Sequence, residues 1–290
     1  SLGITLLDFR LNRSSLGLYS NLRDFLSLYK MLSKIETKSL SLISAKPIIL
    51  GGLSSLFLKI DKVFYSISGM GYVFITNSLK TKILQKVLLV LYRFLFNRKN
   101  TKVVFQNKDD LDVFLKKNIL DEKSSVLIRG NGINLEKFKR SNYPEKLTFL
   151  FASRLLIDKG IKEFIGAADF FQDRNISFLV AGGIDQYNPN SISLDTLNKL
   201  ESSKSIDYLG KVHYKDMEKL FNSAHVFVLP SYREGLPQAA LEAAACSMPL
   251  ILTDVNGCRD CLIDKETGFL IKKKDVQSLT EKINLFVRNP

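Results

Sequence analysis

The residues with the clearest chemical potential lie in the stretch SYREGLPQAALEAAACSMPL, residues 231–250. Two glutamates stand eight positions apart there, Glu234 in a turn rich in glycine and proline and Glu242 in an alanine-rich run that predicts a helix. Glycine lets the backbone approach a ligand closely, and proline is favoured in the first turn of a helix. The predicted helix mouth is formed by Gly235, Leu236 and Pro237.

Two cations precede this stretch, Arg154 and Lys159, which follow an apolar run at 147–153. The free amides and the positive dipole end of a helix favour an anion, and two cations beside them suit a diphosphate. Glu234 would repel phosphates, so we expect it beside them, where it accepts hydrogen bonds from neutral hydroxyls. Glu242, deeper along the helix, reaches other hydroxyls of the same ligand. A ligand with sugar hydroxyls on both sides of a diphosphate is a nucleotide sugar.

The elements that must position these residues alternate between strand and helix, which predicts an α/β fold with parallel sheets. In the first half we expect strands at 3–9, 39–44, 62–67 and 102–106, and a strand that runs into a turn rich in glycine and asparagine within 125–134. We expect helices at 20–35, within 77–100 and at 111–117. The pattern restarts at residue 147. There we expect strands at 147–153, 177–183, 206–210, 225–231, 249–254 and 268–271, and helices at 160–172, 215–223, 237–247 and 275–288. The restart predicts two domains, 1–140 and 141–290.

In open parallel sheets ligands bind beyond the carboxyl ends of the strands. Arg154 and Lys159 follow one such end, Gly182 and Gly183 follow a second, and the turn with Glu234 follows a third. The plainer interpretation is that these are solvated loop charges and an ordinary helix start. Their concentration at the strand ends of one domain favours a binding site.

Charge is divided unevenly along the chain. Residues 1–146 hold 25 Lys and Arg against 11 Asp and Glu, whereas residues 147–290 hold 17 against 18. The basic first half therefore indicates an anionic partner, such as nucleic acid, a phospholipid surface or a phosphorylated substrate. A nucleic-acid partner is disfavoured, because the basic half shows no recognisable nucleic-acid module. No run of apolar residues is long enough to span a bilayer.

The three cysteines are too few for a disulfide framework. Cys258 and Cys261 have the spacing of a redox or zinc pair, but no second pair accompanies them, and His213 and His225 lack ligand spacing. We expect reduced cysteines in a cytosolic protein and no metal site.

The motifs SRLLIDKG, VAGG, VFVLPSYREGLPQAALEA and TGFLI together resemble the donor-binding half of family 4 glycosyltransferases, which have the GT-B fold. GNGINLEKF (130–138) resembles the segment between the two domains of that family. SGMGYVF (68–74), with Gly69 and Gly71, is similar to an acceptor-side loop in the branch that builds bacterial surface polysaccharides and lipid-linked oligosaccharides. The resemblance is strong over 147–271 and looser before it.

The resemblance implies a retaining transfer of a sugar from a nucleotide-sugar donor, UDP-linked, to a lipid-linked or polysaccharide acceptor. It implies two Rossmann-like domains facing across a cleft, no cofactor and no catalytic metal. Arg154 and Lys159 would neutralise the leaving diphosphate, Glu234 would hold the transferred sugar, and Glu242 would hold the ribose hydroxyls. The base would lie against the backbone of Leu209, Gly210 and Val212.

The chain departs from the family pattern at both ends. The family's first strand, glycine-rich loop and first helix have no counterpart before Ser1, and the terminal helices that follow the donor domain have none after Pro290. We therefore expect a chain truncated at both ends, with an incomplete first domain. Such a fragment need not be active although its parent is an enzyme.

Two alternatives remain open at this point. A nucleotide-sugar epimerase of GT-B type would use similar phosphate-binding residues, but it would need acid and base carboxylates in the first domain, where no persuasive loop carries them. A non-catalytic sugar-nucleotide-binding protein is the second alternative.

Residues 77–100 combine an apolar middle with basic residues, as an interfacial helix does. The competing interpretation is a crossover helix buried against the sheet, which the strand expected at 102–106 supports. In either case the basic residues are free to contact anionic lipid headgroups on the inner face of the cytoplasmic membrane. The candidates are Lys80, Lys82, Lys86, Arg93, Arg98 and Lys99.

Overall fold

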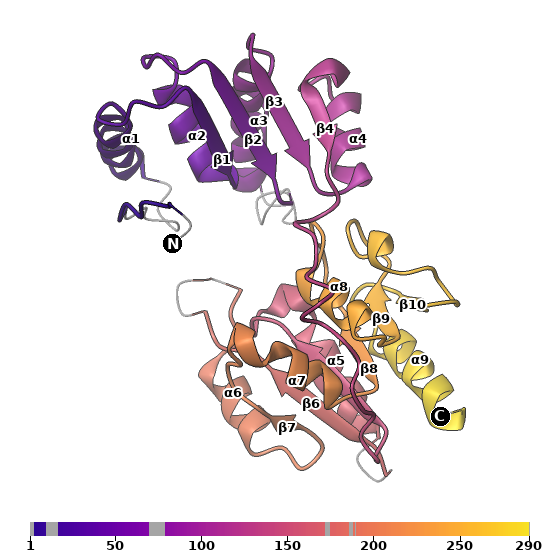
Figure 1. Ribbon diagram of the computed structural model, residues 1–290. Coiled ribbons are helices and arrows are strands. Elements are labelled where there is room, and N and C mark those ends of the chain that lie inside the picture. The colour runs from indigo at the N-terminus through magenta and orange to yellow at the C-terminus, as the bar shows by residue number, and fades with distance from the viewer. Residues whose placement is uncertain are drawn as a thin grey trace. The chain divides into compact units, whose positions relative to one another are not determined.

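The computed structural model describes residues 3–9, 17–69, 79–171, 175–185, 188 and 190–289. The chain divides into two compact units, residues 1–128 and 129–290, each with its own parallel sheet (Figure 1). The expected boundary at 140/141 lies further along the chain than this division. Residues 129–140 go with the second unit, because Phe138 is buried in its core and the Arg140 guanidinium donates to the Ala224 carbonyl.

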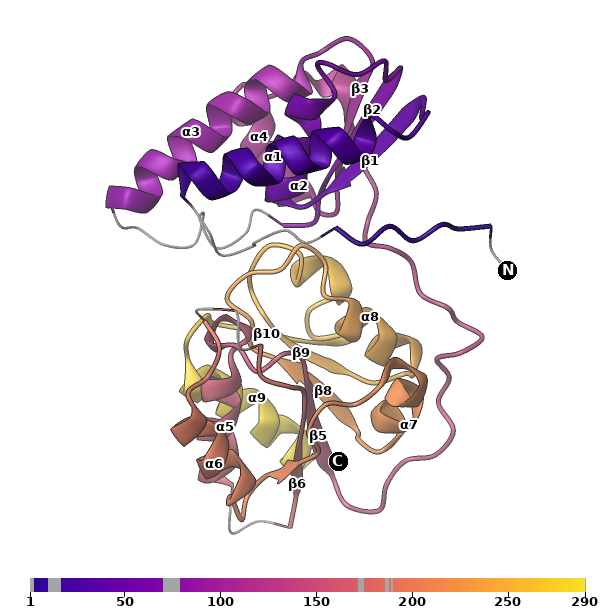
Figure 2. The ribbon, with the colours of Figure 1, turned by 90° about the vertical axis from the view of Figure 1, so that its left-hand side faces the viewer.

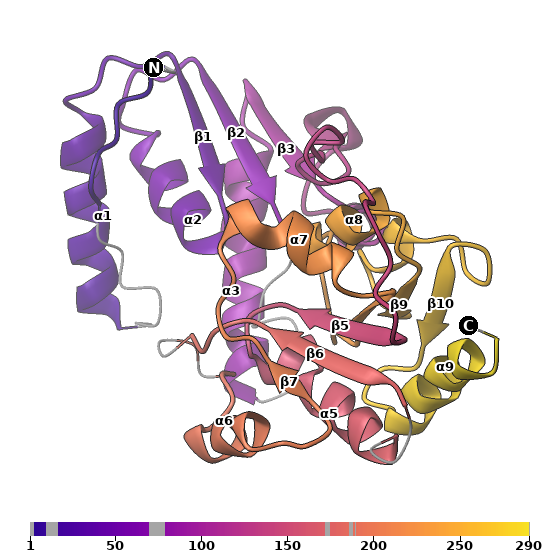
Figure 3. The same ribbon diagram turned by 60° about the horizontal axis from the view of Figure 1, so that its bottom comes forward.

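The first unit contains a four-stranded parallel sheet of order β1-β2-β3-β4. Its strands are β1 (Ser39–Ile43), β2 (Lys62–Ile67), β3 (Thr101–Phe105) and β4 (Ser125–Leu127). Its helices are α1 (Leu18–Leu32), α2 (Ala45–Ser54), α3 (Leu79–Phe96) and α4 (Lys108–Lys116). Figure 3 shows α1 beside α2, on the side away from the strands.

One face of this sheet is covered and the other is open in the described residues. Side chains alternate across a strand, so Val63, Tyr65 and Ile67 of β2 point to one face, where they pack with Phe96 of α3 and Phe114 of α4. The opposite face carries apolar side chains that stay at least a third exposed, among them Ile43, Phe64 and Val126.

Two expectations for the first unit need correction. Residues 3–9 form no strand, because they pair with no described strand and their apolar side chains Ile4, Leu6 and Leu7 are exposed. The helix α2 was not expected, since a proline and two glycines interrupt its sequence. Its glycines are buried, and a Cβ on Gly52 would crowd Leu95 and the Tyr65 hydroxyl.

The second unit contains a six-stranded parallel sheet of order β10-β9-β8-β5-β6-β7. Its strands are β5 (Thr148–Ala152), β6 (Ser177–Ala181), β7 (Asp207–Tyr208), β8 (Val226–Leu229), β9 (Leu250–Thr253) and β10 (Gly268–Ile271). Its helices are α5 (Ile161–Phe170), α6 (Leu194–Glu201), α7 (Met217–Asn222), α8 (Gln238–Ala245) and α9 (Val276–Arg288). The helix α6 was not expected.

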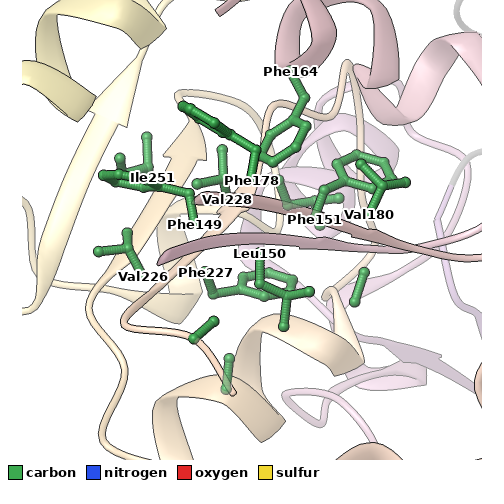
Figure 4. Packing of buried hydrophobic residues seen from close by; sticks show 14 of the residues in the cluster. Phe149, Leu150, Phe151, Phe164, Phe178, Val180, Val226, Phe227, Val228 and Ile251 are labelled. Carbon is green, nitrogen blue, oxygen red and sulfur yellow. The ribbon is translucent and has the colours of Figure 1, made fainter. Parts of the chain in front are cut away.

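The central strands of this unit are continuous apolar runs because helices cover both faces of the sheet. Figure 2 shows α5 and α9 on one face and α7 and α8 on the other. On the α5 side Phe149 and Phe178 stack with ring centroids 5.4 Å apart, and Phe164 meets Phe178 edge-on at 5.7 Å (Figure 4). The strand ends are therefore held on a rigid support. The predicted fold, two parallel-sheet α/β domains, is confirmed.

Candidate active site

A turn after β5 brings Lys159 to the loop after β8. Gly160 has φ 79°, a left-handed conformation that favours glycine, and a Cβ there would overlap the Pro230 carbonyl. The Tyr232 N–H donates to the Asp158 carbonyl at 2.8 Å, which ties the two loops together. The absence of a side chain at residue 160 therefore lets the loops after β5 and β8 touch.

This contact forms an ion pair between Lys159 and Glu234. The Lys159 Nζ lies 2.6 Å from the Glu234 Oε1, and the two side chains are 17% and 10% exposed. The Ser231 hydroxyl is 2.8 Å from the same carboxylate oxygen and donates to it. Glu234 is thus fixed by two donors at the mouth of α8, and Ser231 is a contributor that sequence reasoning did not single out.

The helix α8 begins one residue later than expected, with Pro237 as its N-cap. Gly235 and Pro237 are buried, and Leu236 is half-buried. A Cβ on Gly130 would overlap the Leu236 side chain, and the Gln238 side-chain amide donates to the Gly132 carbonyl at 3.2 Å. The GNG segment therefore packs against the start of α8.

Glu242 lies one turn further along α8 and is buried. The Gln238 side-chain amide donates to its Oε1 at 3.4 Å. Burial raises the pKa of the Glu242 carboxyl, while the Gln238 amide and the Lys137 ammonium act in the opposite direction. A carboxylate kept in a desolvated place is suited to accept hydrogen bonds from a bound molecule.

A second group of predicted residues lines a cavity of about 500 Å³ at the carboxyl ends of β5 and β6. Four of the predicted residues line it, and so do residues that the sequence did not single out, including Asp185, Lys211 and Met217. The predicted lining residues are Arg154, Gly182, Gly183 and Val212.

Gly182 lets the ends of β5 and β6 approach closely beside this cavity, because a Cβ there would overlap the Ser153 carbonyl. Its N–H donates to the Gly210 carbonyl at 2.8 Å, and the Leu209 N–H donates to the Val180 carbonyl at 2.8 Å. Leu209 and Gly210 are thus hydrogen-bonded to β6 and to the turn that follows it, and they are not among the residues that line the cavity.

Arg154 stands at the cavity with a partner of its own. Its Nη1 lies 2.8 Å from the Asp185 Oδ2, and the Arg154 side chain is 59% exposed. Asp185 follows the Gly182–Gly183 turn, so the pair links the ends of two neighbouring strands. Exposure lets an incoming anion compete with Asp185 for the guanidinium.

The described part of the chain contains no group of three or more His, Cys, Asp and Glu side chains arranged to hold a metal ion. Cys258 is buried and Cys261 is half-buried. Burial is the main cause that raises the pKa of both thiols, that of Cys261 to about 12. Both thiols are therefore protonated at neutral pH, as expected of reduced cysteines.

The structure describes some of the residues predicted to contact the acceptor or the membrane in the first unit. Gly69 follows β2 with φ 127°, whereas Gly71 lies outside the described residues. The side chains of Lys82, Lys86, Arg93 and Lys99 are exposed. Arg98 donates to the Ser55 hydroxyl at 2.9 Å, and the Lys80 side chain lies outside the described part.

The helix α3 combines the two interpretations given for residues 77–100. Tyr92, Leu95 and Phe96 are buried in the core, as in a crossover helix. A second side of the helix leaves an apolar stripe more than half exposed, which we call the α3 stripe: Leu79, Ile83, Val87, Val90 and Phe94. No helix in the described residues is long and apolar enough to cross a membrane.

The fold has two parallel-sheet α/β units with charged residues at the carboxyl ends of the strands, and comparison with known proteins gives the family. Residues 133–290 match the model of the glycosyl transferases group 1 family, so the chain belongs to that family and is a glycosyltransferase.

Two relatives match nearly the whole chain. One is the N,N'-diacetylbacillosaminyl-diphospho-undecaprenol alpha-1,3-N-acetylgalactosaminyltransferase of Campylobacter jejuni, 30% identical over 99% of this chain and 78% of the relative. Another is the UDP-Gal:alpha-D-GlcNAc-diphosphoundecaprenol alpha-1,3-galactosyltransferase of Escherichia coli, 28% identical over 94% of this chain and 72% of the relative.

Solved structures agree on the fold. Sucrose-phosphate synthase from Thermosynechococcus elongatus aligns with a TM-score of 0.77 at 20% identity, over 94% of this chain and 70% of that one. Anabaena HepE in complex with UDP and glucose aligns with a TM-score of 0.73 at 16% identity, over 95% and 75%. The two parallel-sheet units are thus of the GT-B type.

Proposed function

We propose that this protein transfers a sugar from a UDP-linked donor, with retention of anomeric configuration, to a diphosphate-linked lipid acceptor in bacterial envelope glycan synthesis. The observation that carries the proposal is the fixed Lys159–Glu234 pair at the mouth of α8, on the same sheet edge as the cavity beside Arg154. A cation suited to a leaving phosphate lies beside a carboxylate suited to sugar hydroxyls, which supports the proposal.

In this proposal the cavity takes the nucleoside, and the diphosphate lies between Arg154, Lys159 and the amides that open α8. Arg154 exchanges Asp185 for a phosphate oxygen. Lys159 and Glu234 stay together, so that Lys159 faces the developing charge of the leaving group while Glu234 receives hydroxyls of the transferred sugar. Stabilising that charge is the main catalytic contribution. We propose that these cations fill the role without a metal cofactor.

Retention and membership of family 4 rest on the motif resemblance, which covers Arg154, Lys159, Glu234 and Glu242 in one domain. Glu242 takes the ribose hydroxyls, since it lies deeper along α8 than Glu234. In this proposal Glu234 contacts the transferred sugar and Glu242 contacts the ribose. Variants of the two glutamates can therefore be told apart by experiment.

The acceptor class rests on the two long relatives, whose names describe sugars carried on diphosphoundecaprenol. A lipid acceptor places the enzyme at a membrane surface, and α3 has the composition for it. The exposed Lys82, Lys86 and Arg93 directly precede Ile83, Val87 and Phe94, so a row of cations runs along one side of the α3 stripe. We propose peripheral binding to the anionic inner leaflet of the cytoplasmic membrane through this helix.

Calorimetry of the full chain with UDP, GDP, ADP and UDP-sugars tests the donor assignment. We expect UDP and at least one UDP-sugar to bind, and Glu234→Gln to weaken the UDP-sugar while leaving UDP nearly unaffected. Glu266→Gln, an exposed glutamate remote in sequence, is the matched control. Equal losses for UDP and the UDP-sugar would place Glu234 on the nucleotide side, and binding of GDP or ADP alone would exclude a UDP donor.

A further inference from the structure

The two oxygens of the Glu234 carboxylate have different surroundings. Oε1 accepts hydrogen bonds from the Lys159 Nζ at 2.6 Å and from the Ser231 hydroxyl at 2.8 Å. Oε2 accepts none within the part of the chain that the structure describes, and it is not among the buried polar atoms that lack a partner there. Solvent therefore reaches Oε2, and this is the oxygen that is open to a ligand.

The ammonium group of Lys159 does not by itself fix the direction of Oε2. The torsion that turns a glutamate carboxylate about its last bond is broad, so contacts must fix the plane of the carboxylate. An ammonium on a flexible four-carbon stem acts as a point charge with three rotatable donors, which neutralises a carboxylate without orienting it. A second donor on a shorter and more rigid side chain is needed, and Ser231 carries it.

The Ser231 hydroxyl is held firmly. Ser231 is fully buried just beyond the end of β8, and the position of its oxygen depends on one torsion. The loop is fastened at this point, because the Tyr232 N–H donates to the Asp158 carbonyl at 2.8 Å. The hydroxyl also lies 3.1 Å from the Asp158 carbonyl oxygen and 3.4 Å from that of Arg233. It has one proton to donate, and the Glu234 carboxylate is the nearest of the three acceptors and the charged one.

The backbone of Glu234 is held by the loop after β9. Gly257 has φ 76°, and a Cβ there would overlap the Gly235 carbonyl and lie 2.8 Å from the Glu234 carbonyl oxygen. The loops after β5, β8 and β9 thus meet at this residue. Because the backbone and Oε1 of Glu234 are both fixed, Oε2 points in one direction.

A hydrogen-bond acceptor of fixed direction can distinguish sugars that differ in the orientation of one hydroxyl. A site built to bind a substrate hydroxyl rejects an analogue that does not present the hydroxyl there. Glucose and galactose differ in the orientation of a single hydroxyl, so a fixed acceptor favours one of them. A carboxylate that is free to turn would follow either hydroxyl and would discriminate less.

We propose that Ser231 is a positioning residue that sets the sugar specificity of the donor site. By holding Oε1 of Glu234, it directs Oε2 at a hydroxyl of one epimer of the transferred sugar. This inference rests on the proposed function. It concerns the choice between donor sugars, which the assignment of Glu234 to the sugar leaves open.

Calorimetry of the full chain with two epimeric pairs tests the proposal: UDP-glucose with UDP-galactose, and UDP-N-acetylglucosamine with UDP-N-acetylgalactosamine. We expect wild type to bind one member of a pair about tenfold more tightly than the other. Ser231→Ala should bring the two affinities to within about twofold of each other and leave the affinity for UDP unchanged. Ser54→Ala is the matched control and should keep the wild-type ratio, because Ser54 is equally buried and its hydroxyl donates to the Leu50 carbonyl within α2.

A double-variant comparison separates positioning from a loss of packing. In Glu234→Ala, the further change Ser231→Ala should leave the ratio of the epimer affinities unaltered, since the hydroxyl no longer has a carboxylate to hold. A ratio that changes in this background would overturn the proposal. So would a wild-type ratio in Ser231→Ala alone, an equal loss of UDP and UDP-sugar affinity in that variant, or a wild type without preference in either pair.

The same titrations distinguish failure of this inference from failure of the proposed function. If wild type binds no UDP-sugar, the proposed function fails and the inference fails with it. If wild type binds UDP-sugars and only the predicted change of ratio is missing, Ser231 has no part in specificity, and the proposed function stands.

Discussion

At the residue scale, the charged groups proposed to contact the donor already have partners. Lys159 holds Glu234, and Arg154 holds Asp185. The first pair is nearly buried and the second is exposed, so the two pairs have different roles when a diphosphate arrives. The buried pair is a fixed part of the site, whereas the exposed pair must open.

The Arg154–Asp185 pair gives a prediction in which removing a charge improves binding. Asp185→Asn should tighten UDP binding by about 0.2–1 kcal/mol, because an exposed ion pair of that strength no longer competes for the guanidinium. Calorimetry measures the change. Asp195→Asn is the control, since Asp195 pairs with Lys199 within α6. Unchanged or weaker UDP binding in Asp185→Asn would show that Arg154 does not exchange partners.

Glu242 gives a prediction about pH and stability. Burial raises the pKa of its carboxyl in the folded state, so the folded protein binds more protons than the unfolded chain above the ordinary value of 4.5. Stability from this group is therefore present below that value and is lost as pH rises through the raised pKa. Glu242→Gln should remove this loss of stability and raise the melting temperature of the ligand-free protein at neutral pH. The same change should lower the affinity for the nucleotide-sugar donor.

Thermal melts of both proteins from pH 4 to pH 8 measure the effect. The difference between Glu242→Gln and wild type should grow with pH over the lower part of this range and then level. A difference that is constant with pH would show that the Glu242 carboxyl does not change its pKa on folding.

At the scale of elements, the site depends on loops that meet because a side chain is missing. Gly160→Ala should destabilise the protein, since a Cβ would overlap the Pro230 carbonyl at a left-handed φ of 79°. Gly132→Ala is a matched control with φ 77° and no atom near its Cβ position. The control should cost about 1–2 kcal/mol from the backbone alone, and Gly160→Ala a further 1–3 kcal/mol or so from overpacking.

Urea unfolding of the two variants gives the comparison. Gly160→Ala should also lower the affinity for a UDP-sugar, because the overlap with Pro230 would displace the loop that carries Glu234. Equal losses of stability in the two variants would mean that the contact with Pro230 does not hold the loops together.

The elements also show where sequence reasoning reached its limit. Continuous apolar runs identified the central strands of the second unit, and the residue types around Glu234 identified the helix mouth. The pairings were not predicted, because Lys159 and Glu234 are 75 positions apart and Arg154 and Asp185 are 31 apart. Only the strand order brings them together. The apolar stretch at 3–9 predicts a strand at the start of a series of strands and helices. A strand needs a partner, however, and residues 3–9 have none in the described chain.

At the scale of the whole molecule, the charge distribution separates two tasks. The first 146 residues hold the excess of Lys and Arg, and the candidate active site lies in the nearly neutral remainder. A strongly basic domain attracts anionic partners, so its charge would contribute nothing to binding a neutral soluble acceptor. Each cation near an anionic membrane contributes about 1 kcal/mol, and salt screens the attraction.

We therefore predict that the protein sediments with anionic vesicles at low salt and less so at high salt. Neutralising Lys80, Lys82, Lys86, Arg93, Arg98 and Lys99 together should abolish binding at low salt. Replacing Ile83, Val87, Val90 and Phe94 with serine should weaken binding at high salt too, without a loss of thermal stability, because these side chains are exposed. Equal sedimentation of the neutralised variant and wild type would exclude α3 as the membrane contact.

We propose that the Lys159–Glu234 pair serves sugar transfer from a nucleotide donor. The most direct measurement incubates the protein with UDP-sugars and a short-chain prenyl-diphosphate-linked sugar, and determines the anomeric configuration of the product by NMR. We predict transfer with the configuration of the donor retained, and loss of transfer in Lys159→Gln without loss of UDP-sugar binding. An inverted product, or full transfer by Lys159→Gln, would contradict the claim.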